Sequence, residues 1–379
     1  MNFGFSEEQE MLRESARKFL EAQCPTSSVR KMMEDEVGHS DELWKKLAEM
    51  GWLGLLVPQK LGGMGGSFLD ATVILEEMGK ALFPGPFLSS VLFGAVAVAG
   101  GGTTAQKKEI LPSVADGSRI LTVACGEDPR RDEADVRLEA KRRRGEFVLC
   151  GEKRFVLEAS VADWIIVAAR TARVKGDPRR GITLFLVERG APGLSIAPLP
   201  TVDKTRRQAN VSFDGVSVPA KRMLGRLGEG WPILARSLEV ATTAISVETV
   251  GVAQRALELA VEYARERTQF GKPIGSFQAV KHKCVDMMVA VENARSLAYY
   301  AAWAVEERHR DCAKAVAMAK AYTSEMGKSV TAEAIQIHGG IGFTWEHDIH
   351  LYYRRALANE ATFGAAPLHR EAVARQLNL

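Results

Sequence analysis

One short segment in the second half of the chain combines positive charge, an aromatic ring and a helix-ending turn. It reads Arg-Glu-Arg-Thr-Gln-Phe-Gly-Lys-Pro-Ile and follows a long amphipathic helix that the apolar pattern predicts over residues 233–267. Arg267 supplies charge for a pyrophosphate, and Phe270 supplies an aromatic face for an adenine. Gly271 and Pro273 end the helix and leave backbone N–H groups for an anion. A dinucleotide requires these groups.

A second segment, farther along the chain, is rich in glycine. It reads Gln-Ile-His-Gly-Gly-Ile-Gly-Phe-Thr-Trp-Glu-His-Asp and begins at Gln336. Gly339 and Gly340 allow a backbone to approach a phosphate closely because neither carries a Cβ atom. Gln336 is a polar anchor beside them, and we expect His338 to order the phosphate turn.

Together, the two segments resemble the acyl-CoA dehydrogenase family, and the resemblance covers nearly the whole chain. It includes the segments 5–12, 51–58 and 151–156. The family consists of FAD flavoenzymes that desaturate acyl-CoA thioesters between the α and β carbons. The resemblance implies a mainly α fold with an α-helical domain, a small β-barrel middle domain and a four-helix bundle. We place these domains at residues 1–118, 119–226 and 227–379.

In this family, residues of a neighbouring subunit hold the adenosine and pyrophosphate end of FAD. Matching the motifs assigns that role here to Arg267, Phe270, Gln278, Gln336 and Gly340, with Gly339 beside them. Because all of these residues are present, the resemblance predicts that the protein binds FAD as an oligomer.

The flavin-facing motifs of the middle region depart from the family pattern. The family typically has Thr-Glu-Pro followed by Gly-Ser-Asp, whereas residues 125–129 here read Cys-Gly-Glu-Asp-Pro and no Gly-Ser-Asp occurs. The aromatic and hydroxyl residues that usually follow Gly-x-Lys are Phe155 and Leu157. Phe155 keeps a ring that can pack on a flavin. Leu157 lacks a side-chain donor near flavin N5, so backbone donors would have to serve.

The implied reaction needs a base for the α-proton and an acceptor for the β-hydride. No amino-acid side chain accepts a hydride, so a cofactor is obligatory. In the family the acceptor is flavin N5, and a glutamate is the base. The commonest position of that glutamate aligns with Phe363, and the alternative position aligns with Ala241. Neither residue can accept a proton.

One carboxylate on the long predicted helix is a candidate for the missing base. Glu248 lies two helical turns beyond Ala241 and therefore on nearly the same face. Its neighbours three and four residues away are apolar or glycine, so it has no ion-pair partner on its own helix. A carboxylate on an apolar face has a raised pKa, which suits a general base at neutral pH. The alternative is a glutamate that points to solvent or pairs with another helix.

A branch of the family also has Glu in an Ala-Glu-x-x-Gly context, where this chain has Val-Glu-Thr-Val-Gly over residues 247–251. The same branch shares the Phe-Thr-Trp-Glu-His-Asp segment at 343–348. Its members often form α2β2 heterotetramers with a divergent second subunit, so the resemblance predicts either a homotetramer or such a heterotetramer.

The pattern of elements agrees with three regions. Apolar residues at helical spacing dominate up to about Ser118, with Gly62–Gly66 as a loop between helices. Short alternating runs follow, at 120–124, 146–150, 164–168, 182–187 and 211–213, and predict a small antiparallel barrel. From residue 230 onward, helices are predicted over 233–264, 276–308, 311–336 and 356–377, as in an antiparallel bundle.

Composition excludes several classes of protein. The 379 residues carry a net charge of only +3, which gives no argument for nucleic-acid binding. The basic run Lys141–Arg144 is expected at a solvated hairpin tip. The apolar stretch Val91–Ala99 is too short to span a bilayer and is predicted to be a buried helix. Five cysteines without a regular spacing and an N-terminus without an export pattern indicate free thiols and a cytoplasmic protein.

His347 and His350 have a spacing that metal ligands can use. No matching Cys, Asp or Glu set accompanies them, and a flavin mechanism needs no metal, so surface or interface histidines are the favoured interpretation. We predict no metal site.

Three functional hypotheses follow. The first is an FAD-dependent acyl-CoA dehydrogenase that passes electrons to an electron-transfer flavoprotein, with Glu248 as the base. The second is a non-catalytic subunit that completes the FAD site of a partner. The third is a flavin oxidase or monooxygenase on the same fold.

Overall fold

The structure is a computed structural model that describes residues 5–128 and 134–379. The chain folds into two compact units, each built from separate stretches of sequence. One unit comprises the chain up to Lys31, Phe68–Phe83 and Thr242–Leu379; the other comprises Met32–Ser67 and Pro84–Ala241. The predicted division into three domains stays a prediction.

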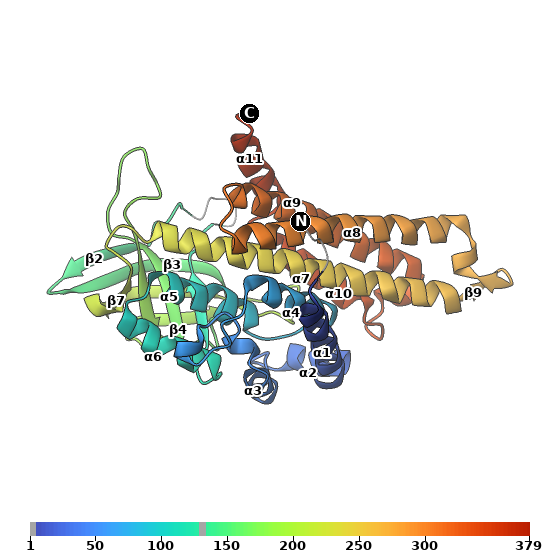
Figure 1. Cartoon of the computed structure of the whole chain (residues 1–379), viewed down its shortest axis with the longest axis horizontal. Helices are drawn as coiled ribbons and strands as arrows, with labels where there is room; N and C mark the ends of the chain where they lie inside the picture. Colours follow the sequence, from blue (N-terminus) through green and yellow to red (C-terminus); the bar gives the residue numbers. More distant parts are fainter. Residues whose placement is uncertain (1–4, 129–133) are drawn as a thin grey trace. The chain divides into compact units, whose positions relative to one another are not determined.

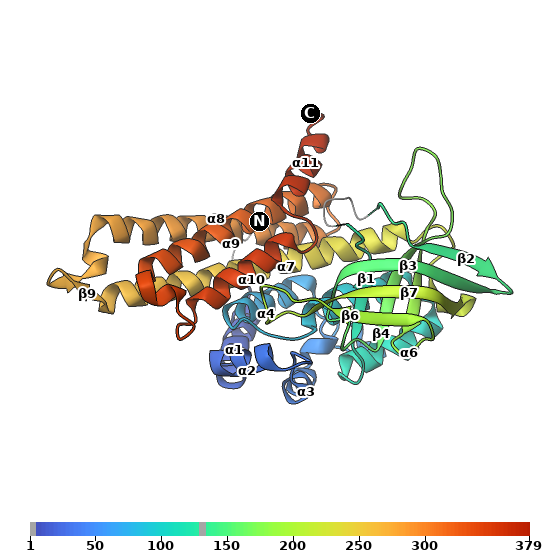
Figure 2. The ribbon, with the colours of Figure 1, turned by 180° about the vertical axis from the view of Figure 1, so that it is seen from behind.

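The first unit is helical (Figures 1 and 2). Its helices α8, α10 and α11 each pack on α9, and α1 packs on α4. The helices of the whole chain are α1 (Glu7–Gln23), α2 (Thr26–Glu34), α3 (Asp41–Glu49), α4 (Phe68–Lys80), α5 (Ala95–Gly101), α6 (Thr104–Ala115), α7 (Trp231–Glu266), α8 (Gln278–Glu306), α9 (Cys312–His338), α10 (Ile349–Ala361) and α11 (Ala366–Gln376).

The predicted long helices α7, α8 and α9 are confirmed with small shifts at their ends. The last predicted helix is wrong as a single element, because α10 ends at Ala361 and α11 begins at Ala366. Between them Phe363 and Gly364 have left-handed backbone angles, with φ of 59° and 93°. Two successive left-handed residues cannot continue an α-helix, so the chain turns here.

Helices α4 and α7 approach each other unusually closely at two glycines. A Cβ atom added to Gly251 would lie 2.0 Å from the Glu76 carbonyl oxygen, and one added to Gly79 would lie 2.2 Å from the Glu248 carbonyl oxygen. The two backbones can touch only because both positions lack side chains. This contact fixes α7 at the turn that carries Glu248.

The second unit contains one eight-stranded sheet and the helices α3, α5 and α6. The sheet order is β6-β7-β3-β2-β4-β5-β8, with β1 paired to β4. The strands are β1 (Leu121–Ala124), β2 (Glu139–Arg143), β3 (Glu146–Leu157), β4 (Trp164–Arg170), β5 (Ile182–Glu188), β6 (Leu194–Pro198), β7 (Gln208–Pro219) and β8 (Met223–Leu224).

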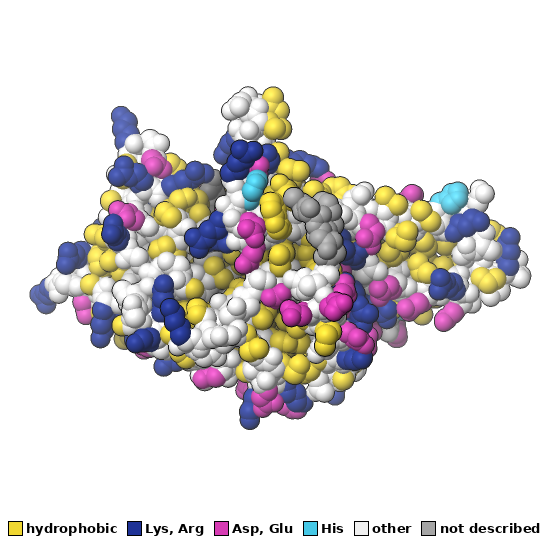
Figure 3. Space-filling model, in the orientation of Figure 1, with side chains coloured by type: hydrophobic (Ala, Val, Ile, Leu, Met, Phe, Trp, Pro, Cys, Tyr) yellow, Lys and Arg dark blue, Asp and Glu magenta, His cyan; other side chains and the backbone are white. Residues whose placement is uncertain are grey.

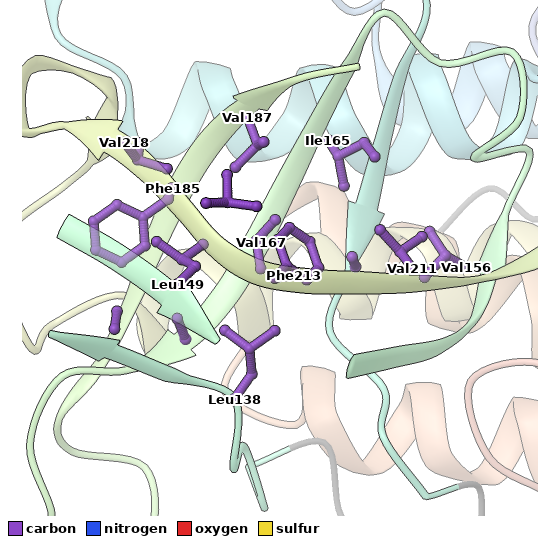
Figure 4. Packing of buried hydrophobic residues seen from close by; sticks show 14 of the residues in the cluster. Leu138, Leu149, Val156, Ile165, Val167, Phe185, Val187, Val211, Phe213 and Val218 are labelled. Atoms are coloured by element: carbon purple, nitrogen blue, oxygen red, sulfur yellow. The ribbon is translucent and has the colours of Figure 1, made fainter. Parts of the chain in front are cut away.

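The five predicted strands are present, and β3 and β7 extend farthest beyond their predicted ranges. The expectation of a purely antiparallel barrel needs correction, since β1 and β2 both pair with β4 in parallel. Strands β2 and β3 form the predicted hairpin, and its basic tip is exposed. Alternating apolar residues from β2, β3, β4, β5 and β7 pack into one core between the curved strands (Figure 4).

The predicted buried segment at Val91–Ala99 is part of a π-helical stretch, Phe87–Gly94, and of α5. Within the described residues, no helix is long and apolar enough to cross a membrane. All five cysteines lie in the described part of the chain, and no disulfide joins them.

Candidate active site

The predicted helix break after Arg267 is a two-residue β-hairpin. Strands β9 (Thr268–Gln269) and β10 (Lys272–Pro273) pair antiparallel, and the Ile274 N–H donates to the Arg267 carbonyl at 2.8 Å. The tip consists of Phe270 and Gly271, with φ of 52° and 81°, a conformation that favours two-residue hairpins. The Phe270 ring is 90% exposed, so its large apolar face is available to a ligand or a neighbouring chain.

The second predicted segment forms an open turn at the C-terminal end of α9. Gly339 has a φ of 63°, and a Cβ atom added to Gly339 or Gly340 would meet nothing within 4 Å. The space beside these two residues is therefore open to a ligand. Gln336 is exposed on the last turn of α9, three residues before Gly339.

An aromatic stack joins the two segments. The ring of Tyr263, one turn before Arg267 on α7, stacks on the buried ring of His338 at 4.6 Å between centroids. His338 also hydrogen-bonds through Nδ1 to the Ala334 carbonyl at 2.7 Å, and burial lowers its pKa. The neutral imidazole thus packs the end of α7 against the end of α9. The predicted role of His338 in ordering the turn agrees with this geometry.

The residues at this end of the helical unit fit the adenosine and pyrophosphate of FAD. Arg267 and Gln278 are exposed, the latter as the first residue of α8. Figure 3 shows Lys and Arg side chains together with hydrophobic ones where the β9–β10 hairpin projects. The structure therefore brings Arg267, Phe270, Gln278, Gln336, Gly339 and Gly340 to accessible positions on the connections and helix ends of one unit.

The two flavin-facing candidates of β3 are placed differently. Phe155 lies in a bulge where the pairing of β3 with β7 shifts register, has a φ of 53° and is 49% exposed. Bulges of this kind turn a side chain out of the sheet, so the ring is accessible. Leu157 is buried, and its carbonyl accepts a hydrogen bond from the Thr122 hydroxyl at 2.6 Å. Leu157 therefore offers no side-chain hydrogen-bond donor to a flavin.

Lys153, two residues before the bulge, anchors this part of the sheet. Its side chain is fully buried, and its ammonium donates to the Glu127 carboxylate at 2.6 Å and to the Cys125 carbonyl at 3.0 Å. The same carboxylate accepts backbone N–H bonds from Arg137 and Leu138. The altered segment around Glu127 therefore has a structural role in this protein. Of that segment, Pro129 lies outside the described residues.

Glu248 is buried and forms an ion pair with another helix. Its Oε1 accepts a hydrogen bond from Arg355 Nη1 of α10 at 2.6 Å, and both side chains are almost completely buried. Arg355 Nη2 also approaches the carbonyl oxygens of Leu82 and Phe83, at 3.4 and 3.3 Å. The alternative in which Glu248 pairs with another helix is thus what the structure shows.

This ion pair changes the electrostatic argument for Glu248. An apolar surrounding alone would favour the protonated carboxyl, whereas a guanidinium at hydrogen-bond distance favours the carboxylate. Removing either partner would leave an uncompensated buried charge. Sequence reasoning missed Arg355, although its position follows the buried face of α10 that Tyr352, Ala356 and Asn359 mark at helical spacing.

Phe363 and Ala241, which align with the family's glutamate positions, offer no proton acceptor. Phe363 is half-buried in the turn after α10, and Ala241 is fully buried on α7.

The histidines near the glycine turn pack against other rings. His347 packs against His338 at 4.4 Å between ring centroids, and His350 stacks on Trp345 at 4.9 Å. Within residues 5–128 and 134–379, no group of three His, Cys, Asp or Glu residues could hold a metal ion.

Comparison with known proteins now identifies the family. Residues 6–118 match the acyl-CoA dehydrogenase N-terminal domain, residues 126–216 the middle domain and residues 228–378 the C-terminal domain. The chain belongs to the acyl-CoA dehydrogenase family. The fold, the FAD-dependent oxidoreductase class and the acyl-CoA substrate class that the sequence predicted are confirmed.

Relatives and structural neighbours support this family along the whole chain. Acyl-CoA dehydrogenase IpdE2 of Mycolicibacterium smegmatis is 33% identical over 360 residues, which cover 95% of each chain. Butyryl-CoA dehydrogenase from Megasphaera elsdenii superposes with a TM-score of 0.91 at 29% identity, with both chains fully covered. A chain of the ChsE4-ChsE5 complex from Mycobacterium tuberculosis superposes with a TM-score of 0.91 at 30% identity, covering 100% of this chain and 99% of that one.

As a member of the acyl-CoA dehydrogenase family, the chain catalyses the FAD-dependent dehydrogenation of an acyl-CoA thioester. The alternative of a non-catalytic subunit is not favoured by these comparisons.

Proposed function

We propose that this acyl-CoA dehydrogenase uses Glu248 as its base and a neighbouring subunit's hairpin and glycine turn to complete each FAD site. The observation that supports the proposal best is the pair of accessible segments, Arg267–Phe270 and Gln336–Gly340, joined by the Tyr263–His338 stack. Both segments belong to the helical unit and project outward from its helix ends. When bound, FAD supplies the acceptor for the β-hydride.

Glu248 is proposed to take the α-proton of the thioester. A base must be ionised before it can accept a proton, and the Arg355 guanidinium favours that form. Burial of the carboxylate, at 3% exposure, keeps bulk water from competing for the same proton. Arg355 orients the carboxylate and would keep it in place when the α-proton moves.

An oligomer is proposed because large apolar side chains are exposed on the helical unit. Phe270 is 90% and Phe343 is 77% exposed, far more than aromatic residues of a monomer usually are. Val285, Met288 and Val289 are each about half-exposed at helical spacing on α8. A second copy of the chain, or a paralogous subunit in an α2β2 assembly, would cover these surfaces. The ChsE4-ChsE5 neighbour is itself a complex of two different chains.

The reduced cofactor must pass two electrons to an acceptor, and we propose an electron-transfer flavoprotein for that role. Anaerobic mixing of the FAD-loaded protein with butyryl-, isobutyryl-, octanoyl- and cyclohexanecarboxyl-CoA tests the whole proposal. We expect at least one thioester to bleach the yellow flavin and to lose two hydrogens by mass spectrometry. Reoxidation should require the electron-transfer flavoprotein. Rapid reoxidation by oxygen alone would support the oxidase hypothesis instead.

A substrate outside this panel would be found by purifying the complex from its native host. Mass spectrometry of that complex identifies both a partner subunit and a bound acyl-CoA. A flavin that remains oxidised with the acyl-CoA that co-purifies would contradict the dehydrogenase proposal.

A further inference from the structure

The C-terminal end of α10 is held by a buried lysine. Lys320 of α9 is 1% exposed, and its Nζ donates to the Asn359 carbonyl at 2.6 Å, the Glu360 carbonyl at 3.0 Å and the Ser324 hydroxyl at 3.0 Å. An ammonium has three protons, so these three acceptors satisfy it completely. The last carbonyls of a helix lack intrahelical partners and carry partial negative charge, which makes a cation there favourable.

The turn that follows α10 is held by a second, partly buried side chain. His369 Nε2 lies 2.9 Å from the Phe363 carbonyl oxygen, and since that oxygen only accepts, the ring nitrogen carries the proton. Gly364 lies close to the same ring, because a Cβ atom added to it would lie 3.2 Å from His369 Nε2. Burial lowers the pKa of His369 to about 4, with Lys320 nearby acting in the same direction.

The left-handed conformation of Phe363 is strained for a residue with a bulky side chain. Such conformations persist only where surrounding contacts stabilise them, and they cluster at functional sites. His369 of α11 holds the carbonyl of Phe363 itself, and Lys320 of α9 holds the carbonyls of Asn359 and Glu360 just before the turn.

The same end of α10 is tied to the helix that carries Glu248. Asn359 donates through Nδ2 to the Thr249 hydroxyl at 3.1 Å, and Arg355, one turn earlier, holds Glu248 itself. Lys320 donates to the backbone carbonyl of Asn359, the same residue whose side chain hydrogen-bonds Thr249. A shift at the C-terminal end of α10 is therefore transmitted to Glu248 through two buried polar contacts.

We propose that Lys320 and His369 are positioning residues for the α-proton transfer, acting by fixing the end of α10 and the turn Thr362–Ala365 against Glu248. The proposal rests on the proposed function of Glu248. Neither side chain needs to touch the substrate. Each one removes freedom from α10, which sets the orientation of the carboxylate.

The test replaces each residue and provides matched controls. Lys320→Met keeps the length of the side chain and removes the ammonium. Lys328→Met is the control, because Lys328 lies on the same helix and pairs with Glu360 of α10 through an ion pair at 3.1 Å that is partly exposed. His369→Leu removes the donor to Phe363, and His369→Gln keeps a side-chain N–H that can reach the same carbonyl.

Two readouts separate positioning from stability. The first is the rate of flavin reduction by the most rapidly oxidised thioester of the panel. The second is exchange of its α-hydrogen with deuterated water, which requires the base and no electron transfer.

In Lys320→Met and His369→Leu, both rates should fall by roughly 10²-fold, as expected for misplacement of a reacting group by about 1 Å. FAD content and the dissociation constant for acyl-CoA should stay within about twofold of wild type. His369→Gln should recover most of the rate, and Lys328→Met should retain it.

Unchanged exchange and reduction rates in both Lys320→Met and His369→Leu would overturn the inference, even if the melting temperature falls. If Lys320→Met does not fold, the His369→Leu and His369→Gln pair decides the question by the same two rates. A wild-type protein that neither exchanges the α-hydrogen nor reduces its flavin would instead refute the proposed function. Amide hydrogen exchange in residues 358–368 gives a check that needs no activity, and it should accelerate in both variants.

Discussion

Three buried basic side chains in this protein each have several polar partners. Lys153 meets a carboxylate and a carbonyl, Lys320 meets two carbonyls and a hydroxyl, and Arg355 meets Glu248 and two carbonyls. Desolvating a charge is costly, so partial satisfaction would destabilise each site. Their locations beside the flavin-facing bulge, the turn at Phe363 and the candidate base connect local stability to the reaction.

Glu248→Gln keeps shape and polarity and removes the ability to accept a proton. Flavin reduction by acyl-CoA should slow by about 10²–10⁴-fold, the usual effect of removing a general base, while FAD and acyl-CoA still bind. Stopped-flow absorbance measures the rate. Glu262→Gln, on an exposed part of the same helix, is the control and should react like wild type.

Phe363 stands where the family's usual glutamate would be, so Phe363→Glu should restore part of the rate in the Glu248→Gln protein. A wild-type rate in Glu248→Gln alone would leave Glu248 as a structural partner of Arg355 and assign the base to another residue or to a partner subunit.

Arg267→Ala removes the positive charge proposed to meet the FAD pyrophosphate. The binding free energy of FAD should weaken by roughly 1.5–3 kcal/mol, the range for hydrogen bonds to charged groups. Flavin content after extensive dialysis measures the effect, with the exposed Lys281→Ala of α8 as the control. Retention equal to wild type in Arg267→Ala would remove this residue from the cofactor site.

The lowered pKa of His369 predicts that the folded protein loses stability at acidic pH. Its folded pKa of about 4 lies below its ordinary value of 6.5, so the unfolded chain binds more protons between these limits. Stability should therefore fall as the pH drops from 6.5 towards 4, by up to about 3 kcal/mol from this group. Urea unfolding at both ends of this range, for wild type and His369→Gln, measures the contribution. If the free energy of unfolding depends equally on pH in the two proteins, His369 makes no such contribution.

At the scale of elements, helix α7 serves two sites. One part of it carries Glu248, where α4 and α10 contact it. Its C-terminal end carries Tyr263 and leads directly into Arg267. The glycine contact with α4 fixes its axial position, and the Tyr263–His338 stack fixes its end. Displacement of α7 would therefore affect both proton transfer and cofactor binding.

Gly251→Ala tests the α4–α7 contact. The added methyl carbon would lie 2.0 Å from the Glu76 carbonyl oxygen, so the helices must separate. We expect a loss of about 1–3 kcal/mol in the free energy of unfolding, despite the better helix propensity of alanine. Gly340→Ala is the contrast, because its Cβ would meet nothing within 4 Å. It should leave the stability of the FAD-free protein unchanged and weaken FAD binding. Equal stability of Gly251→Ala and wild type would show that the contact is not tight.

At the scale of the whole molecule, the exposed aromatic residues at the cofactor segments predict that FAD binding depends on assembly. Dilution or interface variants that give a stable monomer should release the flavin, because one subunit supplies only part of each site. Analytical ultracentrifugation with absorbance detection follows mass and flavin together. A folded monomer that keeps a stoichiometric yellow chromophore would refute the shared site.

The sequence by itself determined the family, the long helices and most strands, and it predicted the two candidate cofactor segments. These follow from local information: apolar periodicity, glycine and proline at turns, and motifs whose residues lie close together along the chain. The turns that hold Phe270 and the two glycines could be predicted because glycine and proline mark them in the local sequence.

Only the tertiary structure decided what surrounds Glu248. The apolar helix positions around it correctly predicted burial, but its partner Arg355 comes from a helix more than one hundred residues away in sequence. The same is true of Lys320 with Asn359 and of Lys153 with Glu127, because a buried charge is satisfied by groups that folding brings together. The break at Phe363 and Gly364 was missed for a related reason. The left-handed Phe363 lies in a turn that α9 contacts at Glu360 and α11 contacts at Phe363, and contacts between distant segments leave no signal in the local sequence.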